Sequence, residues 1–154
     1  MGTRTISCYI NGKLWQNSES DMTIGGANQS SFSALGGDNN LYYGVSGIVW
    51  NESVLYLMAV NSRLDDSTEY VLDNSIGNVS FLLDKKEKNT ITFINKNNVK
   101  YLSKENEGVI RIIRSYSGNT LKSREGYFEA TLYNENDPTD VLHITDGRCT
   151  KTYK

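Results

Sequence analysis

The chain has 154 residues, of which 38% are hydrophobic and 22% are charged, and its formal net charge is -2. A chain of this length can bury about two-thirds of its surface, so it needs no metal or disulfide in order to fold. Its basic residues are scattered, and the densest group, residues 84–88, is mixed with Asp84 and Glu87, so we expect no nucleic-acid partner. The longest apolar run, 54–60, is too short to span a bilayer.

The first predicted element is a β-hairpin over residues 5–16. Its two strands flank Asn11-Gly12, a dipeptide that suits a type I′ turn because both central residues of that turn need a positive φ. Side chains alternate between the faces of a strand, and the even-numbered positions of the first strand include Ile6 and Cys8. We therefore expect the even-numbered face to pack on the core.

Residues 17–40 are polar, and both edge strands and a long loop are compatible with their pattern. Runs rich in β-branched and aromatic residues then predict further strands. These lie at 44–50, 54–60, 69–72, 79–83, 90–94, 99–102, 108–114, 127–134 and 141–149. The best candidate for a helix is one short piece at 62–67.

About ten short strands, with no room for helical crossovers, predict an all-β fold with little or no helix. The sequence favours a single domain, 1–154, built as an antiparallel β-sandwich or a barrel-like sheet. The two last strands are joined by the turn-rich segment 134–139, which predicts an antiparallel hairpin.

Motifs that carry chemistry are weak in this sequence. His143 is the single histidine, lies within a predicted strand, and has no nucleophile motif beside it, so we predict no catalytic residues. Cys8 and Cys149 are too widely separated from each other to form the paired spacing of a metal site, and we expect no metal and no cofactor. The acidic loop 134–140 offers oxygen atoms but does not match the calcium-loop pattern, so a solvated turn is the better interpretation.

The aromatic residues carry the recognition potential of the chain, with 10 tyrosines, 2 tryptophans and 4 phenylalanines. Tyr42 and Tyr43 lie in a polar setting and form the candidate ligand-binding pair, since an exposed ring can stack on a sugar or contact a protein. The alternative is that the two rings cover a sheet face. Trp15 and Trp50 lie within predicted strands, and we expect both in the core.

Four segments resemble a family of small Bacteroidetes lipoproteins of unknown function: Ile10–Trp15, Gly108–Ile112, Gly126–Leu132 and Ile144–Arg148. The resemblance covers about half of the chain and implies an extracytoplasmic β-domain, in the periplasm or on the cell surface, with a lipid anchor and export signal outside this sequence. It carries over no catalytic residue. Cys149 stands where the family usually has phenylalanine, and no lipobox precedes Cys8.

Two functional hypotheses follow. The first is a non-catalytic binding module for a glycan or a small apolar ligand, and the alternative is a structural or protein-interaction module of a cell-surface assembly; an enzyme ranks third. An exported protein with two cysteines also suggests a disulfide between Cys8 and Cys149, because an oxidising compartment allows neighbouring thiols to join. Otherwise each cysteine serves as a small buried hydrophobic residue.

Overall fold

The computed structural model describes residues 4–18, 28–37, 40–49, 53–60, 68–75 and 89–152, and their regular elements are all strands. The all-β prediction is therefore confirmed for this part of the chain. The strands are β1 (Arg4–Ile10), β2 (Lys13–Ser18), β3 (Asn28–Gly37), β4 (Asn40–Val49), β5 (Ser53–Val60), β6 (Thr68–Val71), β7 (Thr90–Ile94), β8 (Lys100–Ser117), β9 (Thr120–Asn134) and β10 (Val141–Thr152).

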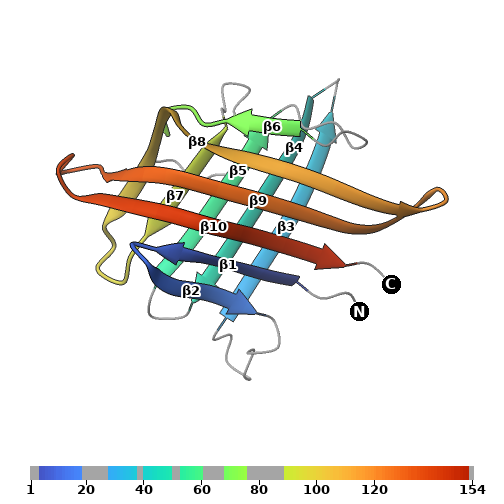
Figure 1. Ribbon diagram of the computed structural model, residues 1–154, viewed down its shortest axis with the longest axis horizontal. Helices are drawn as coiled ribbons and strands as arrows, with labels where there is room; N and C mark the ends of the chain where they lie inside the picture. Colours follow the sequence, from blue (N-terminus) through green and yellow to red (C-terminus); the bar gives the residue numbers. More distant parts are fainter. Residues whose placement is uncertain are drawn as a thin grey trace.

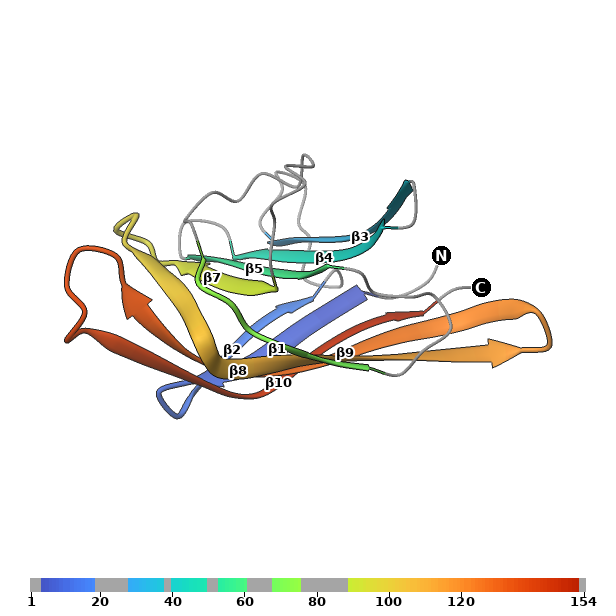
Figure 2. The same cartoon turned by 90° about the horizontal axis from the view of Figure 1, so that it is seen from above.

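The strands form one antiparallel sheet in the order β2-β1-β10-β9-β8-β7-β5-β4-β3, and β6 pairs with β8 (Figure 1). The sheet curls into a half-barrel, so that β3, β4, β5 and β7 form one layer over a second layer of β1, β2, β9 and β10 (Figure 2). The curl also brings β2 beside β3 and β4. Of the two predicted architectures, the structure is closest to the barrel-like sheet.

β8 turns a corner, so that it pairs with β7 in one layer and with β9 in the other. Its ladder with β9 is interrupted between Ser103 and Gly108, and Asn106 within this stretch has a φ of 64°. Gly108 has a φ of 146°, and a Cβ there would lie 2.4 Å from the carbonyl oxygen of Glu129, so only glycine fits. Leu72 fills the corner, accepting a hydrogen bond from the Asn106 N–H and donating one to the Gly108 carbonyl.

A second irregularity lies within β10. The ladder with β9 shifts between Ile144 and Gly147, and Asp146 has a φ of 50°. A Cβ on Gly147 would lie 2.4 Å from both the ring and the carbonyl oxygen of Phe128. The Asp-Gly pair therefore makes a β-bulge that allows Phe128 to pack directly against the β10 backbone.

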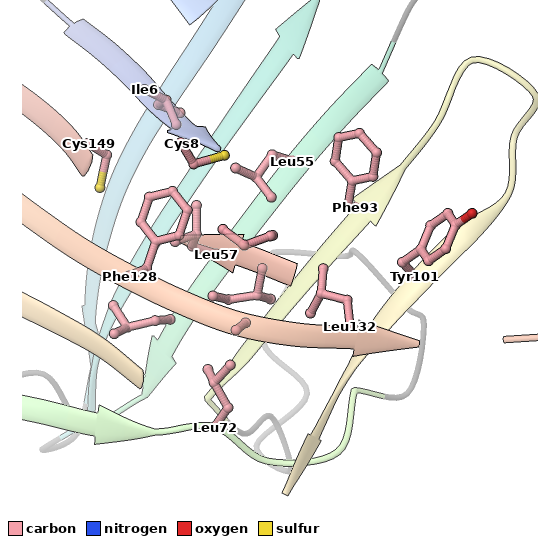
Figure 3. Close-up of a cluster of buried hydrophobic side chains, with 14 of the residues drawn as sticks. Ile6, Cys8, Leu55, Leu57, Leu72, Phe93, Tyr101, Phe128, Leu132 and Cys149 are labelled. Atoms are coloured by element: carbon pink, nitrogen blue, oxygen red, sulfur yellow. The ribbon is translucent and has the colours of Figure 1, made fainter. Parts of the chain in front are cut away.

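The core lies between the two layers (Figure 3). Ile6 and Cys8 are buried, as the alternation in the first strand predicted, and Asn11 and Gly12 have φ values of 49° and 81°, which confirms the turn. Trp15 is half-buried and packs edge-on against Phe93 with the ring centroids 6.3 Å apart. The buried hydrophobic residues are Ile6, Cys8, Leu55, Leu57, Leu72, Ile91, Phe93, Tyr101, Ile110, Ile112, Phe128, Ala130, Leu132, Ile144 and Cys149.

The observed strands differ from the predicted ones mainly in length. β8 joins the two strands predicted at 99–102 and 108–114, because the polar residues between them continue the strand through the corner. The sequence of residues 17–40 was compatible with either edge strands or a loop. Residues 28–37 form β3 at one end of the sheet. The predicted helix at 62–67, the predicted strand at 79–83 and Trp50 lie outside the described residues.

Candidate binding surface

His143 is exposed on β10, and its hydrogen bonds connect neighbouring strands of the sheet. Its backbone N–H donates a 2.7 Å hydrogen bond to Oδ1 of Asn11, and its ring Nδ1 lies 3.4 Å from Oγ1 of Thr131. In the described part of the chain, no group of three or more His, Cys, Asp or Glu side chains is placed to hold a metal ion. Nor do the described residues contain a helix long and apolar enough to cross a membrane.

Several side-chain oxygen atoms of loop 134–140 accept hydrogen bonds from the loop itself and from a neighbouring strand. Asn134 Oδ1 accepts the N–H of Asn136, and Asp137 Oδ1 accepts both the N–H and the hydroxyl of Thr139, which lowers the pKa of Asp137. Asp140 Oδ2 accepts the hydroxyl of Tyr101 at 2.7 Å. These bonds are those of a hydrogen-bonded turn.

Cys8 and Cys149 lie on neighbouring strands and both face the core (Figure 3). Cys149 pairs with Ile6, two residues before Cys8, so the cysteines are diagonal neighbours. Diagonal positions are about 7–8 Å apart, close to the limit of about 7 Å that a disulfide tolerates between Cα atoms. The two side chains are not bonded to each other, and burial raises the pKa of Cys8 to about 12. The disulfide stays a prediction.

Tyr42 and Tyr43, the predicted ligand-binding pair, are consecutive positions of β4. Tyr42 pairs with Leu35 on β3 and with Val60 on β5, and Tyr43 occupies the next rung. Consecutive positions of a strand belong to opposite faces of the sheet, so the backbone does not place the pair on one surface. Their side chains lie outside the described residues.

Two described tyrosines lie on the outer face of β9, and the prediction for Tyr42 and Tyr43 stays open. Phe128, Ala130 and Leu132 are buried in the core, so the alternating positions Tyr127 and Tyr133 face away from it. No strand in Figure 2 covers that side of the layer. The signal was present in the sequence as the alternation along 127–134, which predicted a strand but does not say which face is left uncovered.

Tyr133 lies between a cation and a carboxylate. The Lys104 Nζ lies 3.8 Å from the centroid of its ring, and its hydroxyl donates a 2.7 Å hydrogen bond to Oε1 of Glu107. That hydrogen bond is the main reason that the pKa of Tyr133 is raised. Both Lys104 and Glu107 come from the corner of β8, so the corner that shapes the fold also positions these groups.

Tyr127 repeats this arrangement. The Arg148 guanidinium lies 5.1 Å from the ring centroid, and the Tyr127 hydroxyl donates a 3.0 Å hydrogen bond to Oε2 of Glu125. Across the strands, Tyr127 pairs with Arg148 on one side and with Arg111 on the other, and Arg111 pairs with Glu69. Arg111 and Arg148 are exposed, so each has donors that can reach a molecule placed on the ring.

Exposed apolar groups extend the surface onto the first hairpin. Tyr9 and Leu14 are paired across β1 and β2, with exposed fractions of 41% and 53%. Tyr9 also pairs with Thr145 on β10. We call the surface formed by Tyr9, Tyr127, Tyr133, Lys104, Arg111 and Arg148 the outer tyrosine face.

No protein-family model, curated protein or solved structure matches the chain in the comparisons with known proteins.

Proposed function

We propose that this protein is a non-catalytic module that binds a glycan on the outer tyrosine face. The observation that carries the proposal is the repeated arrangement of Tyr127 and Tyr133, each with a cation within cation–π range of the ring and a carboxylate on the hydroxyl. A sugar ring stacks its C–H bonds on a tyrosine, while its hydroxyls pair with the surrounding charged donors and acceptors. A small apolar ligand would leave those charged groups without compensation, so the glycan is favoured.

Substitutions at Tyr127 test the proposal. Soluble xylan, mannan, laminarin and galactan serve as probes in affinity gel electrophoresis, with binding measured as the retardation of the protein. If the ring stacks on a sugar, Tyr127→Ala weakens binding by about tenfold or more, whereas Tyr127→Phe keeps most of it, because the phenylalanine retains the ring.

Tyr116 provides the matched control, because it is also exposed, at 46%, but lies near the tip of the β8–β9 hairpin away from the outer tyrosine face. Tyr116→Ala should bind as the wild type does. Retardation by none of the four probes, or equal losses in the Tyr116 and Tyr127 variants, contradicts glycan binding at this face.

A protein-interaction module is the second candidate, and Leu14 is the observation that favours it. Leu14 is the most exposed of the large hydrophobic residues described, and it lies on β2, at one end of the sheet order. Exposed apolar side chains at a sheet edge are typical of docking surfaces. Sedimentation velocity at increasing concentration tests the simplest case, self-association, which Leu14→Lys should abolish.

We also propose that the protein is located outside the cytoplasm and is related to the Bacteroidetes lipoproteins. The sequence resemblance alone supports both statements. Fractionation of the cells that produce the protein tests the location, with recovery in the membrane or surface fraction as the expected result. Recovery in the cytosolic fraction would contradict it.

A further inference from the structure

Tyr127 and Tyr133 lie on one regular stretch of β9, which Figure 1 shows as a continuous strand. Every second residue between them is buried, namely Phe128, Ala130 and Leu132. The irregularities in the two adjoining ladders place their extra residues in β8 and in β10, so β9 itself keeps an even rise. The two tyrosines therefore share one face at a spacing that the strand sets.

This spacing is long compared with a single sugar. Strand residues rise about 3.3–3.4 Å each, so six positions place the backbones of the two tyrosines about 20 Å apart along β9. One sugar of an extended chain covers roughly a quarter of that length. A disaccharide cannot touch both rings at once, whereas a chain of about five sugars can, and simultaneous contact requires a ligand that matches the span.

The face between the two tyrosines is polar. Its positions on β9 are Glu129, which is exposed, and Thr131, whose Oγ1 lies 3.4 Å from Nδ1 of the exposed His143 on β10. Carboxylate, hydroxyl and imidazole groups can each form hydrogen bonds with the hydroxyls of a sugar. Neither intervening position carries an aromatic ring, so stacking is confined to the two ends of the stretch.

Each tyrosine can stack on one sugar. Arg148 on β10 lies over the ring of Tyr127, 5.1 Å from its centroid, and Lys104 in the β8 corner lies over the ring of Tyr133, 3.8 Å from its centroid. A ring with a cation over one face can stack on a sugar only through the other face. Tyr127 and Tyr133 are thus two separate subsites.

From this spacing we propose that the ligand of the outer tyrosine face is an extended, linear β-1,4-linked polysaccharide, and that Tyr127 and Tyr133 hold two separated sugars of one chain. The inference rests on the proposed glycan-binding function and adds to it the linkage and the minimum length of the ligand. An extended chain can follow the strand from one ring to the other, whereas a β-1,3-linked glucan coils away from it. Two weak contacts joined by a ligand of matching length bind far more tightly than either contact alone.

Isothermal titration calorimetry with oligosaccharides of increasing length tests the proposal. The probes are cello-, manno- and xylo-oligosaccharides of two, three, five and six sugars, with laminarihexaose as the β-1,3-linked control. The proteins are the wild type, Tyr133→Ala, Tyr133→Phe and the exposed control Tyr116→Ala.

For at least one of the three series, we expect the wild type to bind the hexasaccharide about tenfold or more tightly than the trisaccharide, because only the longer chain spans both rings. Tyr133→Ala should lose this increase with length and still bind the trisaccharide through Tyr127. Tyr133→Phe and Tyr116→Ala should keep the increase. A cooperative thermal unfolding transition in Tyr133→Ala separates a lost subsite from a lost fold.

Three results overturn the proposal: equal affinity for the trisaccharide and the hexasaccharide, an unchanged increase with length in Tyr133→Ala, or tighter binding of laminarihexaose than of every β-1,4-linked hexasaccharide. In each of these cases glycan binding at the outer tyrosine face still stands if Tyr127→Ala loses binding. Failure of every oligosaccharide and polysaccharide to bind overturns both proposals together.

Discussion

Asn11 offers the sharpest test of how the first hairpin is attached to the rest of the sheet. Its backbone N–H donates a 2.9 Å hydrogen bond to the carbonyl of His143, and its side-chain Oδ1 accepts the N–H of the same residue at 2.7 Å. Its Nδ2 is 3.5 Å from the carbonyl of Val141. The residue also adopts a φ of 49°, which the turn requires. Asn11 therefore forms part of the turn through its backbone and continues the ladder between β1 and β10 through its side chain.

Three substitutions separate these contributions. Asn11→Asp keeps the acceptor at Oδ1 and loses only the long Nδ2 contact, so the free energy of unfolding should change by about 0.5 kcal/mol or less. Asn11→Gly keeps the positive φ but loses the hydrogen bond of about 1 kcal/mol and gains freedom in the unfolded chain, for a total of about 1–2 kcal/mol. Asn11→Ala adds the cost of left-handed backbone, and we expect a loss of about 2–3 kcal/mol.

Urea unfolding followed by tryptophan fluorescence measures the series. The expected order of midpoints is wild type and Asn11→Asp, then Asn11→Gly, then Asn11→Ala, with an unchanged slope. If Asn11→Asp is as unstable as Asn11→Ala, the Oδ1 bond to β10 is not what the side chain contributes. If Asn11→Gly matches the wild type, only the turn conformation matters, and the ladder extension is refuted.

Three further predictions use the same unfolding assay or a thiol assay. Gly147→Ala should lower the free energy of unfolding by about 1–3 kcal/mol, because its Cβ would lie 2.4 Å from the facing phenylalanine. Gly118→Asn, in an open turn with a φ of 58°, should lower it by about 0.5 kcal/mol or less. Equal effects would contradict this account of the bulge. The hydrogen bond to Asp140 raises the pKa of Tyr101 from 10.0 to about 12, so its stabilisation is complete below pH 10 and is lost as the pH rises to about 12. The stability difference between wild type and Tyr101→Phe should therefore shrink in that window, and a constant difference would refute the assignment. In the reduced protein, burial raises the pKa of Cys8 to about 12, so thiol reagents should react far more slowly with the native than with the unfolded protein. Without reduction, two titratable thiols in the unfolded protein would rule out the predicted disulfide.

The local features of the fold were predictable because they depend on neighbours in the sequence. The Asn11-Gly12 turn and the buried face of Ile6 and Cys8 follow from turn chemistry and alternation. The length of β8 was not predictable in this way. The middle of β8 is polar, and this pattern predicts a loop between two strands. In the structure, backbone hydrogen bonds to Leu72 and the absence of a side chain at Gly108 allow a corner within one continuous strand.

The candidate binding surfaces were less accessible to sequence reasoning for a different physical reason. Tyr42 and Tyr43 stand out because they are adjacent in sequence, but adjacency in sequence does not say whether two strand residues share a surface, and this pair stays a prediction. Tyr127 and Tyr133 are six positions apart and share a face. Their cations and carboxylates mark these two tyrosines as a candidate site, and Lys104, Glu107 and Arg148 reach them through the β8 corner and the β10 ladder.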